Sequence, residues 1–313
     1  MKLIAAFLKL VRLQNLIFIA LTQFLFYYCI LVPLLESAGL KISLGEVPFI
    51  LLVIASVLIA AAGYIINDYF DVDIDQVNKP QQNVVDIIVS RRWAILWHFV
   101  LSGIGVLLSL YISWATGLWY IVIANLACVF LLFGYSVSLK RKLLSGNILI
   151  SLLTAWVVLI LCLSEIRLFS EVAPGTAQVE HKVVRLGFLY AAFAFVISLI
   201  REAIKDMEDI EGDARHGSAT IPIAWGIQTT KIYVAVWITV LLALLVTTLV
   251  YVLQFHWWWP TVYTLLLIIT PLGFIFYKLF KASTSRQFHF LSNTTKLVML
   301  TGILSMIFFY FYL

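Results

Sequence analysis

The amino-acid sequence predicts an all-α protein that crosses a membrane many times. Hydrophobic residues make up 63% of the 313 residues and charged residues only 12%, and the mean hydropathy is +1.04. Soluble domains carry about 25% charged residues, so this composition excludes the soluble classes of protein. Apolar stretches of about 20 residues recur along the chain, and each can cross a hydrocarbon core of roughly 30 Å as a helix.

Nine apolar stretches are long enough to span a membrane. They cover residues 13–33, 47–66, 93–112, 118–138, 147–164, 184–203, 231–253, 259–280 and 296–313. The first stretch is too long for the core of a signal peptide and no small-residue cleavage site follows it, so we expect it to be retained. The connections are too short to form cores of their own. We therefore expect a single transmembrane domain over residues 1–313.

Basic residues indicate how the chain is oriented. Seventeen of the 21 Lys and Arg residues fall in the N-terminal tail or in the connections after stretches two, four, six and eight, with Lys296 as the last of them. Lys and Arg concentrate in cytoplasmic loops. We therefore expect an integral protein of the cell (inner) membrane with its N-terminus in the cytoplasm. The net charge of +5 reflects this topology and an anionic membrane surface, and gives no support for nucleic-acid binding.

Ten of the 16 acidic residues lie in two short clusters. The first cluster, NDYFDVDID, follows the second stretch. Asn67, Asp71 and Asp75 have an i, i+4, i+8 spacing, with Asp68 one step around, so a helix would stack their oxygen atoms along one face. Charge is costly near a bilayer, which indicates a functional role for the cluster.

The second cluster, REAIKDMEDIEGD, follows the sixth stretch, and Asp206, Asp209 and Asp213 again share one helical face. Each cluster thus follows the second stretch of a four-stretch unit. This placement predicts two pseudo-repeated four-helix halves plus one helix, with the clusters facing each other across a central cavity. Two facing sets of carboxylates suit Mg²⁺, which takes oxygen ligands and helps to hold phosphorylated substrates. The expected site is a diphosphate clamp.

Cations beside the carboxylates are candidates for binding the diphosphate. Lys79, Arg201 and Lys205 lie within or near the clusters, and Lys and Arg commonly bind phosphate oxygens. The alternative is that these residues only orient the protein. The run YSVSLKRK at 135–142 adds hydroxyls and cations on the same side. The His and Cys residues show no spacing typical of zinc, haem or a disulfide framework.

The acidic clusters and the YSVSLKRK run resemble the UbiA superfamily of intramembrane prenyltransferases over nearly the whole chain. The resemblance implies a nine-helix bundle with a central cavity and a lateral opening to lipid. It also implies Mg²⁺ bridging the acidic motifs to a prenyl diphosphate donor, whose prenyl group passes to a lipid-soluble acceptor. No protein partner is implied.

The resemblance also assigns roles to particular residues. It implies metal and diphosphate binding by Asn67, Asp68, Asp71, Asp75, Asp206, Asp209 and Asp213. Among these, it implies that Asp71, Asp75, Asp209 and Asp213 are catalytic. It implies substrate contacts by Asn15, Lys79, Tyr135, Lys140, Arg201 and Lys205.

The identity of the acceptor stays open at this point. Asn78-Lys79-Pro80, the second cluster and TIPIAWG at 220–226 resemble the branch of the family that transfers a geranylgeranyl group to a prenylglyceryl phosphate. That branch usually continues with Arg-Pro-Ile-Pro-Ser-Gly, whereas this chain reads QQNVVDIIVSRR at 81–92. An aromatic quinone precursor is therefore the alternative acceptor.

Two hypotheses from other classes also stand at this point, a cation transporter and a purely structural membrane protein. A transporter would carry its carboxylates near the bilayer midplane on discontinuous helices, whereas here they gather at one membrane face. A structural protein would leave the repeated carboxylates unexplained.

Overall fold

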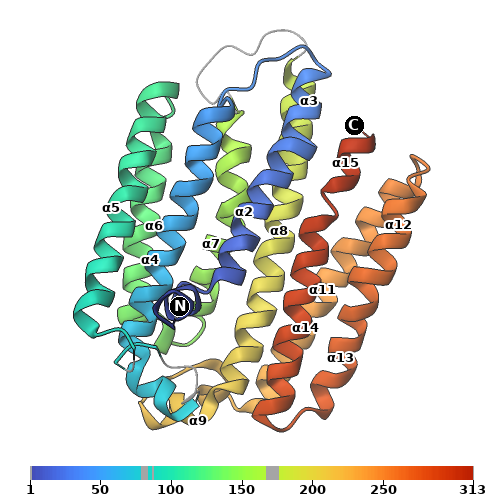
Figure 1. The fold of residues 1–313 in the computed structure, drawn as a ribbon. Coiled ribbons are helices and arrows are strands. Elements are labelled where there is room, and N and C mark those ends of the chain that lie inside the picture. Colours follow the sequence, from blue (N-terminus) through green and yellow to red (C-terminus); the bar gives the residue numbers. More distant parts are fainter. Residues whose placement is uncertain (1, 79–83, 87, 167–175, 313) are drawn as a thin grey trace.

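The computed structural model describes residues 2–78, 84–86, 88–166 and 176–312, and the elements of these residues are all helical (Figure 1). They are α1 (Lys2–Leu10), α2 (Leu13–Phe26), η1 (Tyr27–Leu31), α3 (Val32–Glu36), α4 (Glu46–Asn78), α5 (Arg91–Thr116), α6 (Tyr120–Val137), η2 (Leu139–Arg141), α7 (Ser145–Ser164), α8 (Thr176–Glu208), α9 (Ile210–Arg215), α10 (Ile221–Ala224), α11 (Ile227–Leu253), α12 (Trp258–Thr264), η3 (Leu265–Ile269), α13 (Thr270–Lys281), α14 (Ser285–Leu304) and α15 (Ile307–Tyr312).

Nine helical segments of the described residues are long and apolar enough to cross a membrane. They are Leu13–Glu36, Glu46–Asn78, Arg91–Thr116, Tyr120–Val137, Ser145–Ser164, Gln178–Glu208, Ile227–Leu253, Trp258–Lys281 and Ser285–Tyr312. All nine overlap the predicted stretches, with shifts or extensions at their ends. The prediction of an all-α polytopic membrane protein is confirmed.

The ninth span begins earlier than its apolar stretch predicted. It starts at Ser285 instead of residue 296 because Thr284 and Gln287 form a capping box, in which each side chain pairs with the backbone of the other residue. The polar residues that follow are therefore helical. Lys296, which we expected in a connection, lies well inside α14.

The outer surface of the bundle carries large apolar side chains. Leu107 on α5 is 65% exposed, and Ile123 and Phe130 on α6 are each 67% exposed. A surface of this kind suits contact with lipid, because the backbone polar groups of a helix are already paired within the helix. Hydropathy, helix length and surface together describe an integral membrane protein.

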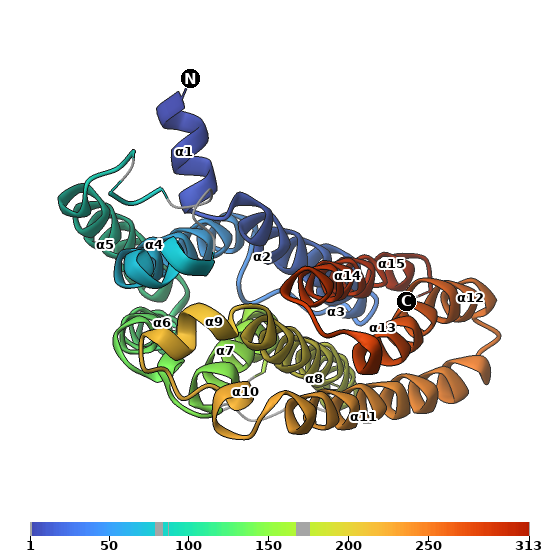
Figure 2. The same ribbon diagram turned by 90° about the horizontal axis from the view of Figure 1, so that it is seen from below.

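The two acidic clusters lie at the same end of the bundle. The helices that carry them, α4 and α8, are each 33 residues long, and both reach the end where α9 lies, at the bottom of Figure 1. We call this the acidic end. Figure 2 looks onto it and shows α2, α4, α6, α7, α8 and α14 arranged around the centre of the bundle. These six helices position the site.

Candidate active site

A cavity of about 320 Å³ lies between the helices that carry the acidic clusters. Eleven of the predicted site residues line it: Asn15, Asn67, Asp71, Asp75, Tyr135, Lys140, Arg201, Lys205, Asp206, Asp209 and Asp213. Two predicted residues are not among its described lining. Asp68 lies to one side, and Lys79 falls outside the described residues.

The first cluster forms the expected face of carboxamide and carboxylate groups, because α4 continues through it to Asn78. Asn67 Nδ2 donates to Asp71 Oδ2 at 2.8 Å, and Lys140 Nζ donates to the other oxygen of Asp71. Asp68 is one residue further around the helix and accepts from Arg12 Nη2 at 2.8 Å. Asp68 was predicted to bind the metal. In the structure its carboxylate forms an ion pair with Arg12 and is not part of the cavity lining.

The second cluster differs from the continuous helical face that its spacing predicted. Helix α8 ends at Glu208, and Asp209 leads into the short helix α9, which turns across the acidic end (Figure 2). Asp206 accepts from Asn147 Nδ2 on α7 at 2.8 Å. Asp206, Asp209 and Asp213 still line the cavity in spite of the break. The break is thus compatible with three carboxylates facing the first cluster.

Asn78 joins the two clusters directly. Its Nδ2 donates to the Asp209 carbonyl oxygen at 3.0 Å, and its Oδ1 accepts from the Gly212 N–H at 2.8 Å. A Cβ on Gly212 would overlap the Asn78 amide, so this close approach needs glycine. We call these two hydrogen bonds the Asn78 clasp. It fixes the last residue of α4 against the start of α9.

The electrostatics of the acidic end favour binding of a cation. The pKa of the Asp213 carboxyl is raised to about 6, first by burial and then by the nearby carboxylates of Asp209 and Asp71. Burial also lowers the pKa of the Lys140 ammonium, although Asp71 opposes that shift. Carboxylates crowded in this way repel one another when ionised, and a divalent cation would relieve the repulsion.

The donor atoms at the acidic end fit Mg²⁺. The described part of the chain contains no group of three or more His, Cys, Asp or Glu side chains close enough together to hold one ion. Mg²⁺ does not need such a cage, because it keeps several waters and binds through one or two carboxylates together with substrate phosphates. Asn67 Oδ1 is buried and has no hydrogen-bond partner. This oxygen and the neighbouring carboxylates of Asp71 and Asp75 suit a hard cation.

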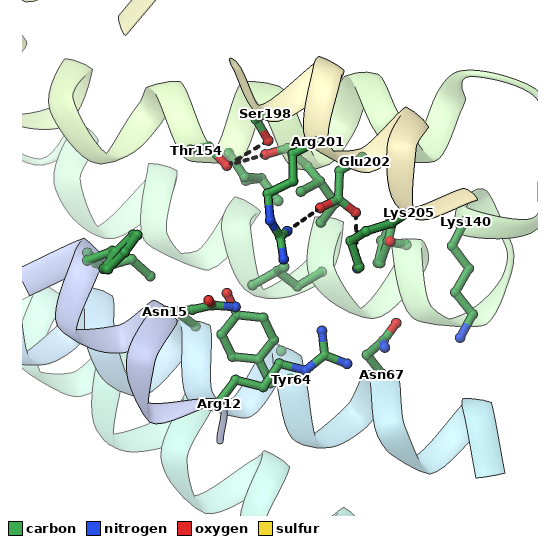
Figure 3. A pocket seen from close by; sticks show the side chains of 18 of the residues that line it. Arg12, Asn15, Tyr64, Asn67, Lys140, Thr154, Ser198, Arg201, Glu202 and Lys205 are labelled. Carbon is green, nitrogen blue, oxygen red and sulfur yellow. Dashed lines mark hydrogen bonds and ion pairs between the residues drawn. The ribbon is translucent and has the colours of Figure 1, made fainter. Parts of the chain in front are cut away.

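Cations dominate the part of the cavity next to the carboxylates (Figure 3). Arg201 Nη1 and Lys205 Nζ both pair with Glu202, at 2.8 and 3.5 Å. Arg12 is the residue just before α2, and its guanidinium lies 5.1 Å from the centre of the Tyr64 ring. Arg12 faces Arg201 and Lys205 across the cavity, and we call these three cations the basic region. The cavity therefore has an acidic end and a basic region.

A sequence profile described as the UbiA prenyltransferase family matches residues 16–312, almost the whole chain. The chain belongs to the UbiA prenyltransferase family. It is thus a prenyltransferase, and the transporter and structural hypotheses are set aside.

Relatives of this UbiA prenyltransferase agree with its fold. Digeranylgeranylglyceryl phosphate synthase from Methanosphaera stadtmanae is 29% identical over 246 residues, which cover 78% of this chain and 81% of that protein. A solved structure of a digeranylgeranylglyceryl phosphate synthase superposes with a TM-score of 0.62 at 23% identity, covering 98% and 99% of the two chains. A UbiA homologue from Archaeoglobus fulgidus bound to DMAPP and Mg²⁺ gives a TM-score of 0.57 at 14% identity, covering 96% and 98%.

Sequence reasoning missed several cavity residues of this UbiA prenyltransferase. Tyr64, Glu202 and Lys296 line the cavity, and Asn78 holds its two acidic motifs together. Tyr64 sits in an apolar stretch without any distinguishing pattern. Glu202 and Lys296 did carry a signal, since an ionisable residue inside a span is a functional candidate. The boundaries predicted from hydropathy placed Lys296 at the edge of its span and so concealed that signal.

Proposed function

We propose that the protein transfers a geranylgeranyl group from its diphosphate to a prenylglyceryl phosphate in a Mg²⁺-dependent reaction. The observation that carries this proposal is the convergence of both acidic clusters and several cations on one cavity inside a membrane bundle. The similarity to digeranylgeranylglyceryl phosphate synthase supports the donor and the acceptor. The homologue bound to DMAPP and Mg²⁺ supports the metal and a prenyl diphosphate.

The residues divide into metal-binding and substrate-binding groups. The proposed metal and diphosphate positions are Asn67, Asp71, Asp75, Asp206, Asp209 and Asp213, with Asp71, Asp75, Asp209 and Asp213 as the catalytic carboxylates. The proposed substrate contacts are Asn15, Lys79, Tyr135, Lys140, Arg201 and Lys205. Asp68 acts on the site through its ion pair with Arg12. When bound, Mg²⁺ neutralises the negative charge that develops on the diphosphate.

The chain's own groups support each stage of the transfer. As the bond between the allylic carbon and the diphosphate oxygen breaks, the ammonium groups of Lys140 and Lys205 stabilise the charge on the departing diphosphate. The rings of Tyr64 and Tyr135 and the apolar walls of the cavity shield the allylic cation from water. The acceptor hydroxyl then bonds to the allylic carbon and gives its proton to a nearby carboxylate, such as Asp75 or Asp213.

We also propose that the active site faces the cytoplasm. Most of the basic connections lie at the acidic end, and Lys and Arg concentrate on the cytoplasmic side of a membrane. The donor and the metal would then enter from the cytoplasm. The protein would be a single domain in the inner membrane of the cell.

The proposal is tested with purified protein in lipid nanodiscs. We expect geranylgeranyl transfer to geranylgeranylglyceryl phosphate, detected by mass spectrometry, to stop on chelation with EDTA and to return when Mg²⁺ is added. A panel of shorter and longer prenyl diphosphates tests the donor. Transfer only to an aromatic quinone precursor would replace the acceptor. If no prenyl diphosphate were consumed in the presence of Mg²⁺ and either acceptor, the proposed reaction would be refuted.

A further inference from the structure

Lys296 is a cation of the cavity that the donor site leaves unused. It lies 11 residues into α14, about 16 Å along the helix from Ser285 at the acidic end. Its side chain lines the cavity, and it makes no hydrogen bond or ion pair with any described residue. A lysine in this position needs an explanation, because an unpaired ammonium inside a membrane protein is costly.

The carboxylates near Lys296 do not neutralise its positive charge. Three cations line the cavity together with Lys296, namely Arg201, Lys205 and Arg12, and the carboxylate of Glu202 lies among them. Glu202 is already shared between Arg201 and Lys205, and Asp68 is paired with Arg12, so these two carboxylates face four cations when Lys296 is included. The positive charge gathered around Lys296 therefore exceeds the negative charge that faces it, and an anion bound here would stabilise the arrangement.

Three neighbouring helices supply the cations of this region. Helix α14 packs against both α2 and α8, and Figure 2 shows the three helices side by side. Arg12 is the residue just before α2, and Arg201 lies in α8. In Figure 3 the guanidinium groups of Arg12 and Arg201 point into the same space. Arg201 Nε is buried and has no hydrogen-bond partner. The region thus offers an unused donor as well as an uncompensated charge.

The departing diphosphate belongs nearer to the acidic end. Arg201 precedes Asp206 by five residues, about 7.5 Å along α8 and away from that end. In the proposed function the diphosphate lies with the metal-binding carboxylates and with Lys140, which contacts Asp71 directly. Its allylic carbon points away from the acidic end because the apolar tail must leave the charged groups. An acceptor hydroxyl that attacks this carbon comes from the side where Lys296 lies.

We propose that Lys296, together with Arg12 and Arg201, binds the anionic head group of the acceptor, a phosphate monoester close to the attacking hydroxyl. This inference rests on the proposed function and adds a second anion site to it. In a glycerol phosphate the ester and the free hydroxyl are carried by adjacent carbons, so the phosphate must lie near the reacting carbon. The basic region supplies that position and gives the active site a preference for charged acceptors.

The test replaces Lys296 by Met, which keeps an unbranched side chain, one atom shorter, and removes its charge. In steady-state assays with geranylgeranylglyceryl phosphate, we expect K296M to raise the KM for the acceptor about 10- to 100-fold, the effect of losing one charge-assisted contact. The KM for geranylgeranyl diphosphate and the half-saturating Mg²⁺ concentration should change less than about twofold. K296R should recover most of the acceptor affinity. K281M, at an exposed lysine of α13, is the matched control.

Glycerol phosphate and 4-hydroxybenzoate serve as competitors that distinguish a phosphate from a carboxylate. We expect glycerol phosphate to compete with the acceptor in the wild type and to compete much more weakly in K296M. Competition by the benzoate alone would overturn the phosphate assignment. An unchanged acceptor KM in an active K296M, or an equal rise in the donor KM, would overturn the anion site while leaving the proposed function intact. Loss of transfer in the wild type itself would refute the proposed function.

Discussion

The Asn78 clasp gives a quantitative prediction about metal binding. Asn78→Ala removes both hydrogen bonds that tie the end of α4 to Asp209 and Gly212. Each such bond contributes about 1 kcal/mol net, so the pair contributes about 2 kcal/mol. That energy corresponds to about 30-fold in an equilibrium constant. If the clasp serves to hold the two acidic clusters at the distance that Mg²⁺ requires, the variant should need about 10- to 30-fold more Mg²⁺ for half-maximal activity.

Gly212→Ala provides an independent route to the same disruption. The added methyl group would overlap the Asn78 amide and push it away, so this variant should shift the Mg²⁺ requirement at least as far as Asn78→Ala. Combining the two substitutions removes the overlap. The double variant should therefore resemble Asn78→Ala alone, a non-additivity typical of residues in direct contact.

Initial rates of prenyl transfer, measured against Mg²⁺ concentration in nanodiscs, give the half-saturating concentration for each variant. Thermal unfolding of the same samples checks that the bundle remains intact, as expected for a change at one end of a long helix. The reasoning would be refuted by an unchanged Mg²⁺ requirement in Asn78→Ala. Additive effects in the double variant would show that Asn78 and Gly212 act separately.

Three further predictions follow from the charged groups. Asp71→Ala should lower the rate of transfer of a radiolabelled prenyl group by about 10²- to 10³-fold without unfolding the protein, whereas Asp73→Ala, in the same motif but 73% exposed, should stay near the wild-type rate. Glu165→Ala should lower the melting temperature at unchanged KM, because it leaves the N–H groups of Ser43 and Leu44 without their acceptor; an unchanged melting temperature would contradict this. Burial raises the pKa of the Glu165 carboxyl in the folded protein above its value in the unfolded chain. The stability of the fold should therefore fall as the pH rises from the pKa of the unfolded chain to that of the folded protein. Thermal unfolding scans of Glu165→Gln should show no such fall.

The sequence alone determined the class of the protein and most of its spans. Apolar stretches of the length needed to cross a bilayer are local properties, and all nine predicted stretches correspond to helical spans of the structure with their ends adjusted. The spacing of Asn67, Asp71 and Asp75 also predicted a shared face correctly, because α4 continues through them without a break. The family membership that these motifs indicated is confirmed.

Only the tertiary structure decided which groups meet. Asp68 pairs with Arg12, 56 residues away, and Lys296 joins the cavity from the ninth span. The helix that carries the second cluster ends before Asp209, and Asn78, at the end of α4, donates a hydrogen bond to the Asp209 carbonyl oxygen. Periodicity within one helix tells which side chains share a face, but the partners of that face depend on how distant helices pack. The basic region and the Asn78 clasp arise from that packing, so no local pattern could reveal them.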